Sequence, residues 1–203
     1  MTTGYALAYR FGLTPWEQAG RDAAVQFNAL LDREQEGDPP FGKALDIGCG
    51  TGDHAVNLAG RGWQVTAVDN VSRALGAARA RSIAAGVEVR CVQADVLDMA
   101  TGVGDGFSFL LDIGCFHGLK PDQRPAYVQQ ADAVSRPGAT LLMMAFRPAR
   151  RPPAPLPRGA SRQELEDSFV RWEVIADDPA DTSCMSAPIK RTAPHFVRLR
   201  RVD

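Results

Sequence analysis

Apolar residues change their spacing several times along the chain, and these changes predict the secondary structure. From Lys43 onward, short β-rich apolar runs alternate with longer Ala- and Arg-rich segments of helical period. This alternation is typical of a parallel sheet that is covered by helices. The expected strands are 44–47, 64–68, 87–93, 107–112, 140–146, 171–175 and 196–200.

The segments between these strands predict helices, and several helix ends are recognisable. The crossover helices are expected at 54–61, 72–85 and 125–135. We expect Ser72 to cap the start of the second helix, Gly86 to end it, and Gly138 to end the third in the same way. Farther on, Ser161 and Glu164 have the spacing of a capping box, which predicts a short helix before a C-terminal β-hairpin.

The flanks of this alternating core follow other patterns. Residues 15–33 have an amphipathic helical period, and a stretch with Gly and Pro separates them from the first strand. We therefore expect residues 1–42 to form an N-terminal helical cap on a core that spans 43–203. Prolines within 148–160 exclude the interior of a strand or helix and predict a loop or lid.

Length and composition favour one compact domain over residues 1–203. Of the 203 residues, 45% are hydrophobic and 23% are charged, which suits a single sizeable core. The 23 basic and 24 acidic residues nearly cancel, so no overall field favours nucleic acid or an anionic membrane. We find no signal peptide and no apolar run long enough to cross a membrane. These features predict a cytoplasmic protein, monomeric or homodimeric.

Metal-binding patterns are absent from the sequence. The four cysteines form no C-x-x-C pair, which argues against a zinc site and a disulfide framework. Histidines and carboxylates do not occur at ligand spacing either. We expect no metal, although a site that pairs Asp112 with a distant acid stays open.

Glycines directly after the first predicted strand form the strongest motif. In the stretch Ala-Leu-Asp-Ile-Gly-Cys-Gly-Thr-Gly, a buried strand runs into Gly48, Gly50 and Gly52, and a helix follows at once. Missing side chains let a ligand lie against this backbone, which includes Cys49 and Thr51. The free amides at the start of the helix would face the same ligand.

Acidic residues near the ends of three successive strands indicate which ligand this is. Asp46 precedes the glycines, where a carboxylate repels a pyrophosphate but suits an ammonium group. Asp69 ends the second strand, before Asn70, and can accept hydrogen bonds from both hydroxyls of a ribose. Asp95 follows the third strand and can accept the amino group of adenine, while Val96 adds an apolar wall. This order of groups matches an amino acid joined to an adenosine.

These residues resemble the motifs of the class I S-adenosylmethionine-dependent methyltransferases over about residues 43–146. The resemblance implies a Rossmann-like three-layer α/β sandwich, with a seven-stranded, mostly parallel sheet and an antiparallel last strand. It implies S-adenosylmethionine as the cofactor. It places the methionine part on Asp46, Gly48 and Gly50, the ribose on Asp69, and the adenine on Asp95 and Val96.

A second, narrower resemblance concerns the N-terminus. Residues 9–17, Tyr-Arg-Phe-Gly-Leu-Thr-Pro-Trp-Glu, are similar to the entry segment of thiopurine- and tellurite-type small-molecule methyltransferases. This likeness implies that Trp16 lies over the methionine end of the cofactor and closes the pocket. The alternative is that Trp16 pins the first helix to the core.

The end of the fourth predicted strand, Leu-Asp-Ile-Gly-Cys-Phe-His-Gly-Leu, is where the chemistry is expected. His117 can accept the proton of a hydroxyl acceptor, or it only hydrogen-bonds its own loop or lines the pocket. Asp112 can hold a substrate, help to orient the cofactor, or only cap the loop amides. We expect Phe116 on the substrate side and Cys115 as a small apolar residue.

Two further groups of polar residues are open to interpretation. Arg147 follows the fifth strand most closely, ahead of Arg150, Arg151 and Arg158, and we expect it to contact an anionic group of the substrate. The alternative is that these arginines are only solvated. We expect His54 at the rim of the pocket and His195 as a structural residue before the last strand.

Together these features predict methyl transfer to the oxygen or nitrogen of a small, aromatic or otherwise apolar acceptor. The chain lacks the Asn/Asp-Pro-Pro-aromatic tetrapeptide common in methyltransferases for nucleic acid and protein amino groups. We therefore expect a small-molecule substrate and no nucleic-acid partner. A thiol, a metalloid or a sugar hydroxyl is an alternative acceptor, and a non-catalytic regulator that binds S-adenosylmethionine is an alternative of another class.

Overall fold

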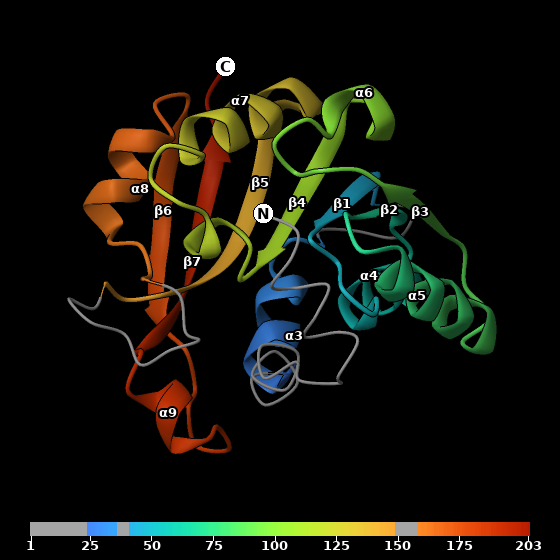
Figure 1. The fold of residues 1–203 in the computed structure, drawn as a ribbon, viewed down its shortest axis with the longest axis horizontal. Helices are drawn as coiled ribbons and strands as arrows, with labels where there is room; N and C mark the ends of the chain where they lie inside the picture. The colour runs from blue at the N-terminus through green and yellow to red at the C-terminus, as the bar shows by residue number, and fades with distance from the viewer. Residues whose placement is uncertain (1–23, 36–40, 149–157) are drawn as a thin grey trace.

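The computed structural model describes residues 24–35, 41–148 and 158–203, which form an α/β fold around a seven-stranded sheet (Figure 1). The sheet order is β3-β2-β1-β4-β5-β7-β6. The strands are β1 (Lys43–Ile47), β2 (Gln64–Asp69), β3 (Val89–Gln93), β4 (Phe107–Ile113), β5 (Ser135–Phe146), β6 (Trp172–Pro179) and β7 (Pro194–Arg201). β7 is antiparallel to both neighbours, whereas the other pairs are parallel. The predicted fold class is confirmed.

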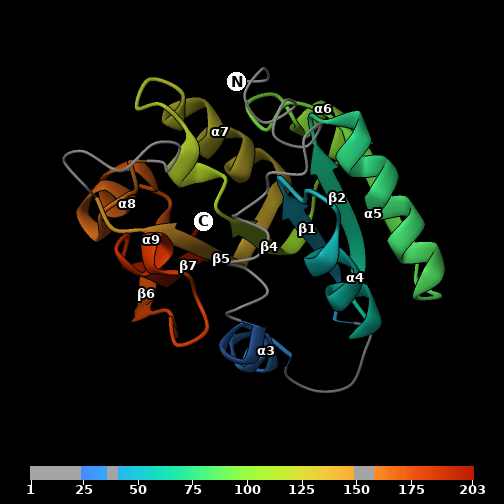
Figure 2. The ribbon, with the colours of Figure 1, turned by 60° about the horizontal axis from the view of Figure 1, so that its bottom comes forward.

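Helices cover both faces of this sheet (Figure 2). The first face carries α3 (Ala24–Asp32), α4 (Asp53–Gly60) and α5 (Ser72–Ala84). The second face carries α6 (Ala100–Val103), α7 (Arg124–Val134) and α8 (Arg162–Ser168). A 3-10 turn, η1 (Phe116–Gly118), follows β4, and α9 (Ala187–Lys190) lies between β6 and β7. The order is that of a three-layer sandwich.

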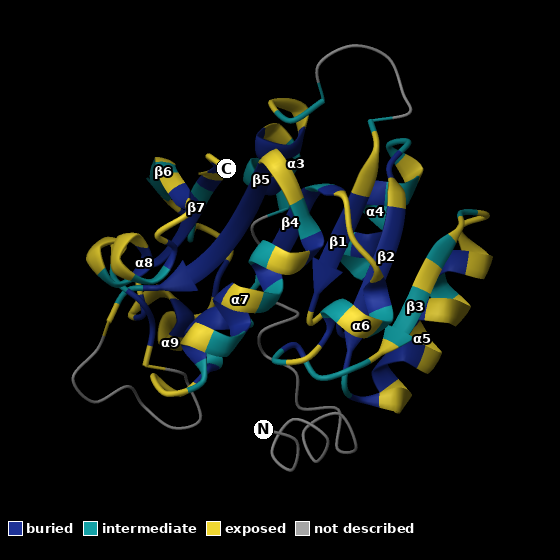
Figure 3. Ribbon diagram, turned by 90° about the horizontal axis from the view of Figure 1, so that it is seen from above, coloured by how far each residue is buried: buried dark blue, intermediate teal, exposed yellow. Residues whose placement is uncertain are grey.

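The central strands are mostly buried (Figure 3), and their side chains supply both hydrophobic cores. In β5, Leu141, Met143 and Ala145 join the core under α7. The alternate residues Leu142, Met144 and Phe146 join the core under α3 and α4. Because successive side chains of a strand point to opposite faces, a strand buried on both faces is a continuous apolar run. This explains why the sequence pattern located the strands.

Two predicted helix ends are wrong. α7 ends at Val134, whereas Gly138 has a φ of +75° and lies inside β5. Pro137 explains the early end, because the residue before a proline avoids the helical region. At the start of α5, the N-cap is Val71 rather than Ser72, and its amide donates to the carboxylate of Asp69.

Other predicted boundaries are confirmed. Gly86 follows α5 with a φ of +66°, as expected of a residue that ends a helix. Ser161 and Glu164 form the predicted capping box at the start of α8. Of the expected N-terminal helix, α3 is the part that the structure describes; Trp16 and residues 149–157 lie outside the described residues. None of the described helices is long and apolar enough to cross a membrane.

Candidate cofactor and acceptor site

The turn after β1 depends on its glycines. Gly48, Gly50 and Gly52 have φ values of +69°, +53° and +80°, a region that other residues enter only with strain. The amides of Gly48 and Cys49 both donate to the carbonyl of Val68, at 2.8 and 3.0 Å. The turn is therefore tied to the end of β2, the neighbouring strand.

Gly52 has a packing role in addition to its backbone conformation. A Cβ atom at Gly52 would lie 2.7 Å from the Cβ of Ala78 in α5. The missing side chain at this position lets α4 and α5 approach each other. The spacing of the three glycines predicted a ligand, whereas helix packing explains Gly52 in the structure.

Asp46 is the most unusual residue of the site. Its side chain is 2% exposed, and its Oδ2 atom has no hydrogen-bond partner among the described residues. Burial, together with the charges of Asp69 and Asp112, raises its pKa to about 7. A buried carboxyl with an unused oxygen beside two other acids is either protonated or paired with a cation. The ammonium group of S-adenosylmethionine would be a suitable cation.

Asp69 organises the turn from the end of β2. Its Oδ2 accepts the amide of Gly50 at 3.0 Å, and its Oδ1 accepts the amide of Val71 at 2.8 Å. A carboxylate oxygen can accept more than one hydrogen bond, which the predicted contact with ribose hydroxyls requires. The side chain of Gln93 donates to the carbonyl of Asn70 at 3.2 Å, which fixes the backbone there. The ribose assignment stays a prediction.

Asp95 and Val96 lie beyond β3, on the same edge of the sheet. Oδ1 of Asp95 accepts the amide of Leu97 at 3.0 Å, so the carboxylate shapes its own turn. Val96 is 5% exposed and belongs to the core on the α7 face. For the predicted contacts with adenine, Asp95 would accept through the remaining lone pairs of its carboxylate. Val96 would donate through its backbone amide.

Asp112 supports the loop after β4. Its carboxylate is fully buried and accepts the amides of Cys115 and Phe116 at 2.6 and 2.9 Å. The hydroxyl of Tyr127 donates a third bond at 2.6 Å, a contact that the sequence analysis missed. Burial raises the pKa of Asp112 to about 6, although these three donors oppose the shift. Asp112 therefore caps the loop amides, and its roles toward substrate and cofactor stay predictions.

Phe116 and Cys115 belong to the same loop but face different surroundings. Phe116 is fully buried and packs against Tyr127 and Phe169, so we correct its expected place on the substrate side. Cys115 lies against the glycine turn, because a Cβ at Gly48 would be 3.3 Å from its Cβ. Burial raises the pKa of the Cys115 thiol well above its usual value, as expected of an apolar residue.

His117 is held by the end of β5. Its Nδ1 accepts the amide of Phe146 at 3.0 Å, and its ring stacks on that of Phe146 at 4.4 Å. Burial, together with the nearby Arg124 and His195, lowers the pKa of His117 to about 3. The ring is therefore neutral, and the bond from Phe146 assigns its proton to Nε2. This geometry favours a hydrogen-bonding role over proton abstraction.

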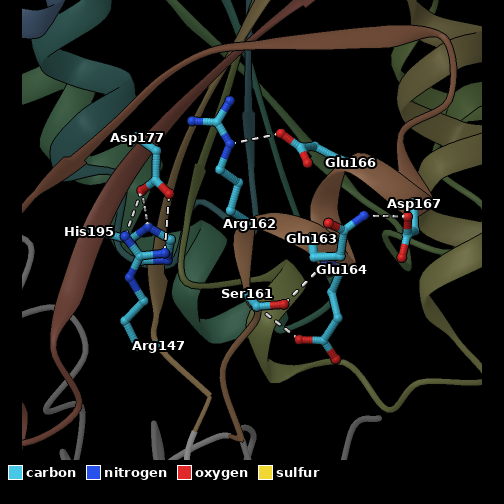
Figure 4. A network of polar contacts seen from close by, with 9 residues as sticks. All are labelled: Arg147, Ser161, Arg162, Gln163, Glu164, Glu166, Asp167, Asp177 and His195. Carbon is cyan, nitrogen blue, oxygen red and sulfur yellow. Dashed lines mark hydrogen bonds and ion pairs between the residues drawn. The ribbon is translucent and has the colours of Figure 1, made fainter.

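Arg147, Asp177 and His195 form a polar network between β5, β6 and β7 (Figure 4). The guanidinium of Arg147 donates two bonds of 3.1 Å to Asp177, whose Oδ1 is 2.5 Å from Nδ1 of His195. Arg147 therefore has a protein carboxylate as its partner in place of the expected substrate anion. His195 lies within β7 rather than before it. No sequence spacing connects Asp177 to this group, and the sequence analysis missed it.

The remaining predicted residues are His54 and the three other arginines that follow β5. His54 is in the first turn of α4 and packs edge-on against Phe27 of α3, with ring centres 4.6 Å apart. Arg158 is exposed, whereas Arg150 and Arg151 lie outside the described residues. Within the described ranges, no three His, Cys, Asp or Glu side chains are grouped to hold a metal ion.

Comparisons with known proteins relate this geometry to methyltransferases. Residues 44–138 match the family model described as a methyltransferase domain. The 2-heptyl-1-hydroxyquinolin-4(1H)-one methyltransferase of Mycobacteroides abscessus is 29% identical over 67% of this chain and 60% of its own length. The ribosomal RNA small subunit methyltransferase C of Chromohalobacter salexigens is 34% identical over 70% of this chain and 40% of its own length. The chain thus spans about half the length of these relatives.

A solved structure shows the same fold. The 1,6-didemethyltoxoflavin-N1-methyltransferase of Burkholderia thailandensis, with 1,6-didemethyltoxoflavin and S-adenosylhomocysteine bound, superposes with a TM-score of 0.75 at 22% identity. The match covers 98% of this chain and 86% of that protein. The segment matched by the family model, 44–138, contains the glycine turn and the acids at the ends of β1 and β2. The chain therefore contains a match to a methyltransferase domain and has the fold of solved methyltransferases.

Proposed function

We propose that this protein transfers a methyl group from S-adenosylmethionine to an oxygen or nitrogen of a small molecule. The observation that carries the proposal is the buried Asp46 carboxylate, whose Oδ2 lacks a partner among the described residues next to a glycine turn. The name of the relative from M. abscessus, a methyltransferase for a hydroxyquinolinone, supports a small-molecule acceptor. A thiol acceptor is the alternative, supported by a solved structure that is 27% identical over 100% of this chain, with a TM-score of 0.73, and is described by the conversion of a disulfide bond into a thioacetal group during echinomycin biosynthesis.

The cofactor, when bound, supplies a methyl group that its sulfonium already activates. The chain then has to hold the cofactor, align the acceptor and exclude water. Asp46 would pair with the ammonium group, the amides around Gly50 would approach the carboxylate end, and Asp69 would accept from the ribose. Asp112, through the amides of Cys115 and Phe116, keeps the loop after β4 beside this turn.

The proposal is tested by turnover with a panel of acceptors. Pure protein is incubated with S-adenosylmethionine and a phenol, an aromatic amine, an aromatic thiol, 2-heptyl-1-hydroxyquinolin-4(1H)-one or a ribosomal RNA fragment. Formation of S-adenosylhomocysteine with the small hydroxyl or amine acceptors supports the proposal. Turnover of the RNA alone would assign the acceptor to nucleic acid instead. Cofactor binding without any turnover would indicate a non-catalytic regulator.

We expect the affinity for S-adenosylhomocysteine to depend on pH through Asp46. The ligand's ammonium group binds the ionised carboxylate, whereas the pKa of Asp46 in the free protein is about 7. Below that pH the carboxyl must first lose its proton, so affinity falls by up to about tenfold per pH unit. Isothermal titration calorimetry across this range measures the slope. A wild-type affinity that is flat with pH would contradict the assignment, and Asp46→Asn serves as the control whose affinity has no such slope.

A further inference from the structure

Asp177 and His195 lie at the edge of the sheet where an acceptor would bind. His195 is the second residue of β7 and pairs with Ala145 near the end of β5. Because β7 is antiparallel, its start lies at the same edge as the carboxyl ends of β4 and β5 (Figure 1). Ligands of open α/β sheets bind at that edge. His117, after β4, is close enough for its pKa to be affected by His195.

The carboxylate of Asp177 determines which ring nitrogen of His195 carries the proton. Arg147 holds this carboxylate with two hydrogen bonds, and Nδ1 of His195 is 2.5 Å from its Oδ1 (Figure 4). Although burial opposes the shift, His195 and Arg147 lower the pKa of Asp177. An ionised carboxylate can only accept, so the proton belongs to Nδ1 and the lone pair to Nε2.

Nε2 of His195 lacks the partner that a buried nitrogen needs. The residue is 1% exposed, and within the described part of the chain no group hydrogen-bonds this atom. An unsatisfied buried acceptor lowers stability, and folded proteins leave few of them. Burial lowers the pKa of His195, whereas Asp177 and the backbone carbonyl of Ala160 act against this shift. That carbonyl is itself an acceptor and cannot donate to the lone pair of Nε2. A hydroxyl of a bound acceptor would supply the missing donor to the neutral ring.

We propose that His195, positioned by Asp177 and Arg147, accepts the acceptor's proton during methyl transfer. The inference rests on the function proposed above. In the step, the acceptor oxygen forms a bond to the methyl carbon, and the carbon–sulfur bond breaks with its electron pair staying on sulfur. The hydroxyl proton moves to Nε2. The resulting imidazolium is balanced by the Asp177 carboxylate, the arrangement by which an acid stabilises a protonated histidine base.

Nitrogen NMR of histidine-labelled protein tests this without any acceptor. We expect His195 to rest as the Nδ1–H tautomer and His117 as the opposite Nε2–H tautomer. The charged and titratable groups facing His195 are Asp177, Arg147 and His117. Asp177→Asn should perturb the His195 signals, whereas Asp178→Asn, its neighbour in β6, should not. An Nε2–H tautomer of His195 near neutral pH would overturn the proposal.

A kinetic test separates proton transfer from a structural role. At mildly alkaline pH, 4-nitrophenol is largely ionised and needs no base, whereas 4-methoxyphenol still carries its proton. We expect His195→Gln to lower kcat/KM for 4-methoxyphenol by about 100-fold or more, but for 4-nitrophenol by less than about tenfold. Asp177→Asn should show the same selectivity with a smaller loss. Calorimetry with S-adenosylhomocysteine should give unchanged affinity for both variants.

The outcomes distinguish this inference from the proposed function. Equal losses with both phenols would mean that His195 is only structural, and would overturn the inference while the methyltransferase function stands. If the wild type binds S-adenosylhomocysteine but turns over neither phenol nor any acceptor of the panel, the proposed function fails and the inference fails with it. If His195→Gln does not fold, Asp177→Asn and the wild-type tautomers decide the question.

Discussion

Replacing Asp46 with asparagine is expected to weaken binding of S-adenosylhomocysteine by about 100-fold or more. The loss follows from the burial of this side chain, because breaking a buried ion pair costs about 2–5 kcal/mol. Asparagine has nearly the same shape, so the glycine turn should keep its geometry. Isothermal titration calorimetry above pH 7, where Asp46 is ionised, measures the effect.

The same substitution should stabilise the protein when no cofactor is bound. Asp46 has a pKa of about 7 in the folded protein, well above the ordinary value of 3.8. The contribution of its raised pKa to the free energy of unfolding is thus complete only below about pH 3.8. It is lost as the pH rises through 7. Above pH 7 the folded wild type must hold a desolvated charge beside Asp69 and Asp112, whereas asparagine carries none. Urea denaturation should show a higher free energy of unfolding for Asp46→Asn, by roughly 1–3 kcal/mol.

These two effects have opposite signs, which separates a binding role from a structural one. Asp105→Asn is the control, since Asp105 is exposed in the loop before β4 and should change neither quantity. A variant that loses both stability and affinity would indicate that Asp46 is a structural residue. An unchanged affinity would remove the ammonium assignment.

The strands could be predicted because their pattern is local. A strand buried on both faces is mostly apolar, and the buried stretches of β1, β4 and β5 satisfy this. The ends of elements were harder to predict, since they depend on contacts from elsewhere. The start of α5 is an example: the carboxylate of Asp69 accepts the amide of Val71, so the neighbouring Ser72 is not needed as a cap.

The same distinction applies to the site. The glycine turn and Asp46 are contiguous in sequence, so their spacing is enough to indicate a cationic, adenosine-like ligand. Arg147, Asp177 and His195 are brought together only by the pairing of β5, β6 and β7. No spacing along the sequence predicts this network. The orientation of Phe116 depends on how the short 3-10 turn packs against α7. The residue type alone does not determine this packing.

Replacing Gly52 with alanine is expected to lower the free energy of unfolding by about 3 kcal/mol or more. Its φ of +80° costs an L-residue about 1–2 kcal/mol, and overpacking a core typically costs about 1–3 kcal/mol. Here the added methyl would lie 2.7 Å from the Cβ of Ala78, and also 3.0 Å from its Cα, so relief requires α5 to move. Urea denaturation without cofactor measures the loss.

Gly60, at the other end of α4, is the matched control for this substitution. Its backbone is helical, and no atom lies within 4 Å of a Cβ built there. Gly60→Ala should therefore leave stability unchanged or raise it by about 0.4–1 kcal/mol, because alanine restricts the unfolded chain. If Gly52→Ala stays within about 1 kcal/mol of the wild type, α4 and α5 do not need this close approach. Gly52 would then have to be explained by the ligand alone, as the spacing of the three glycines suggests.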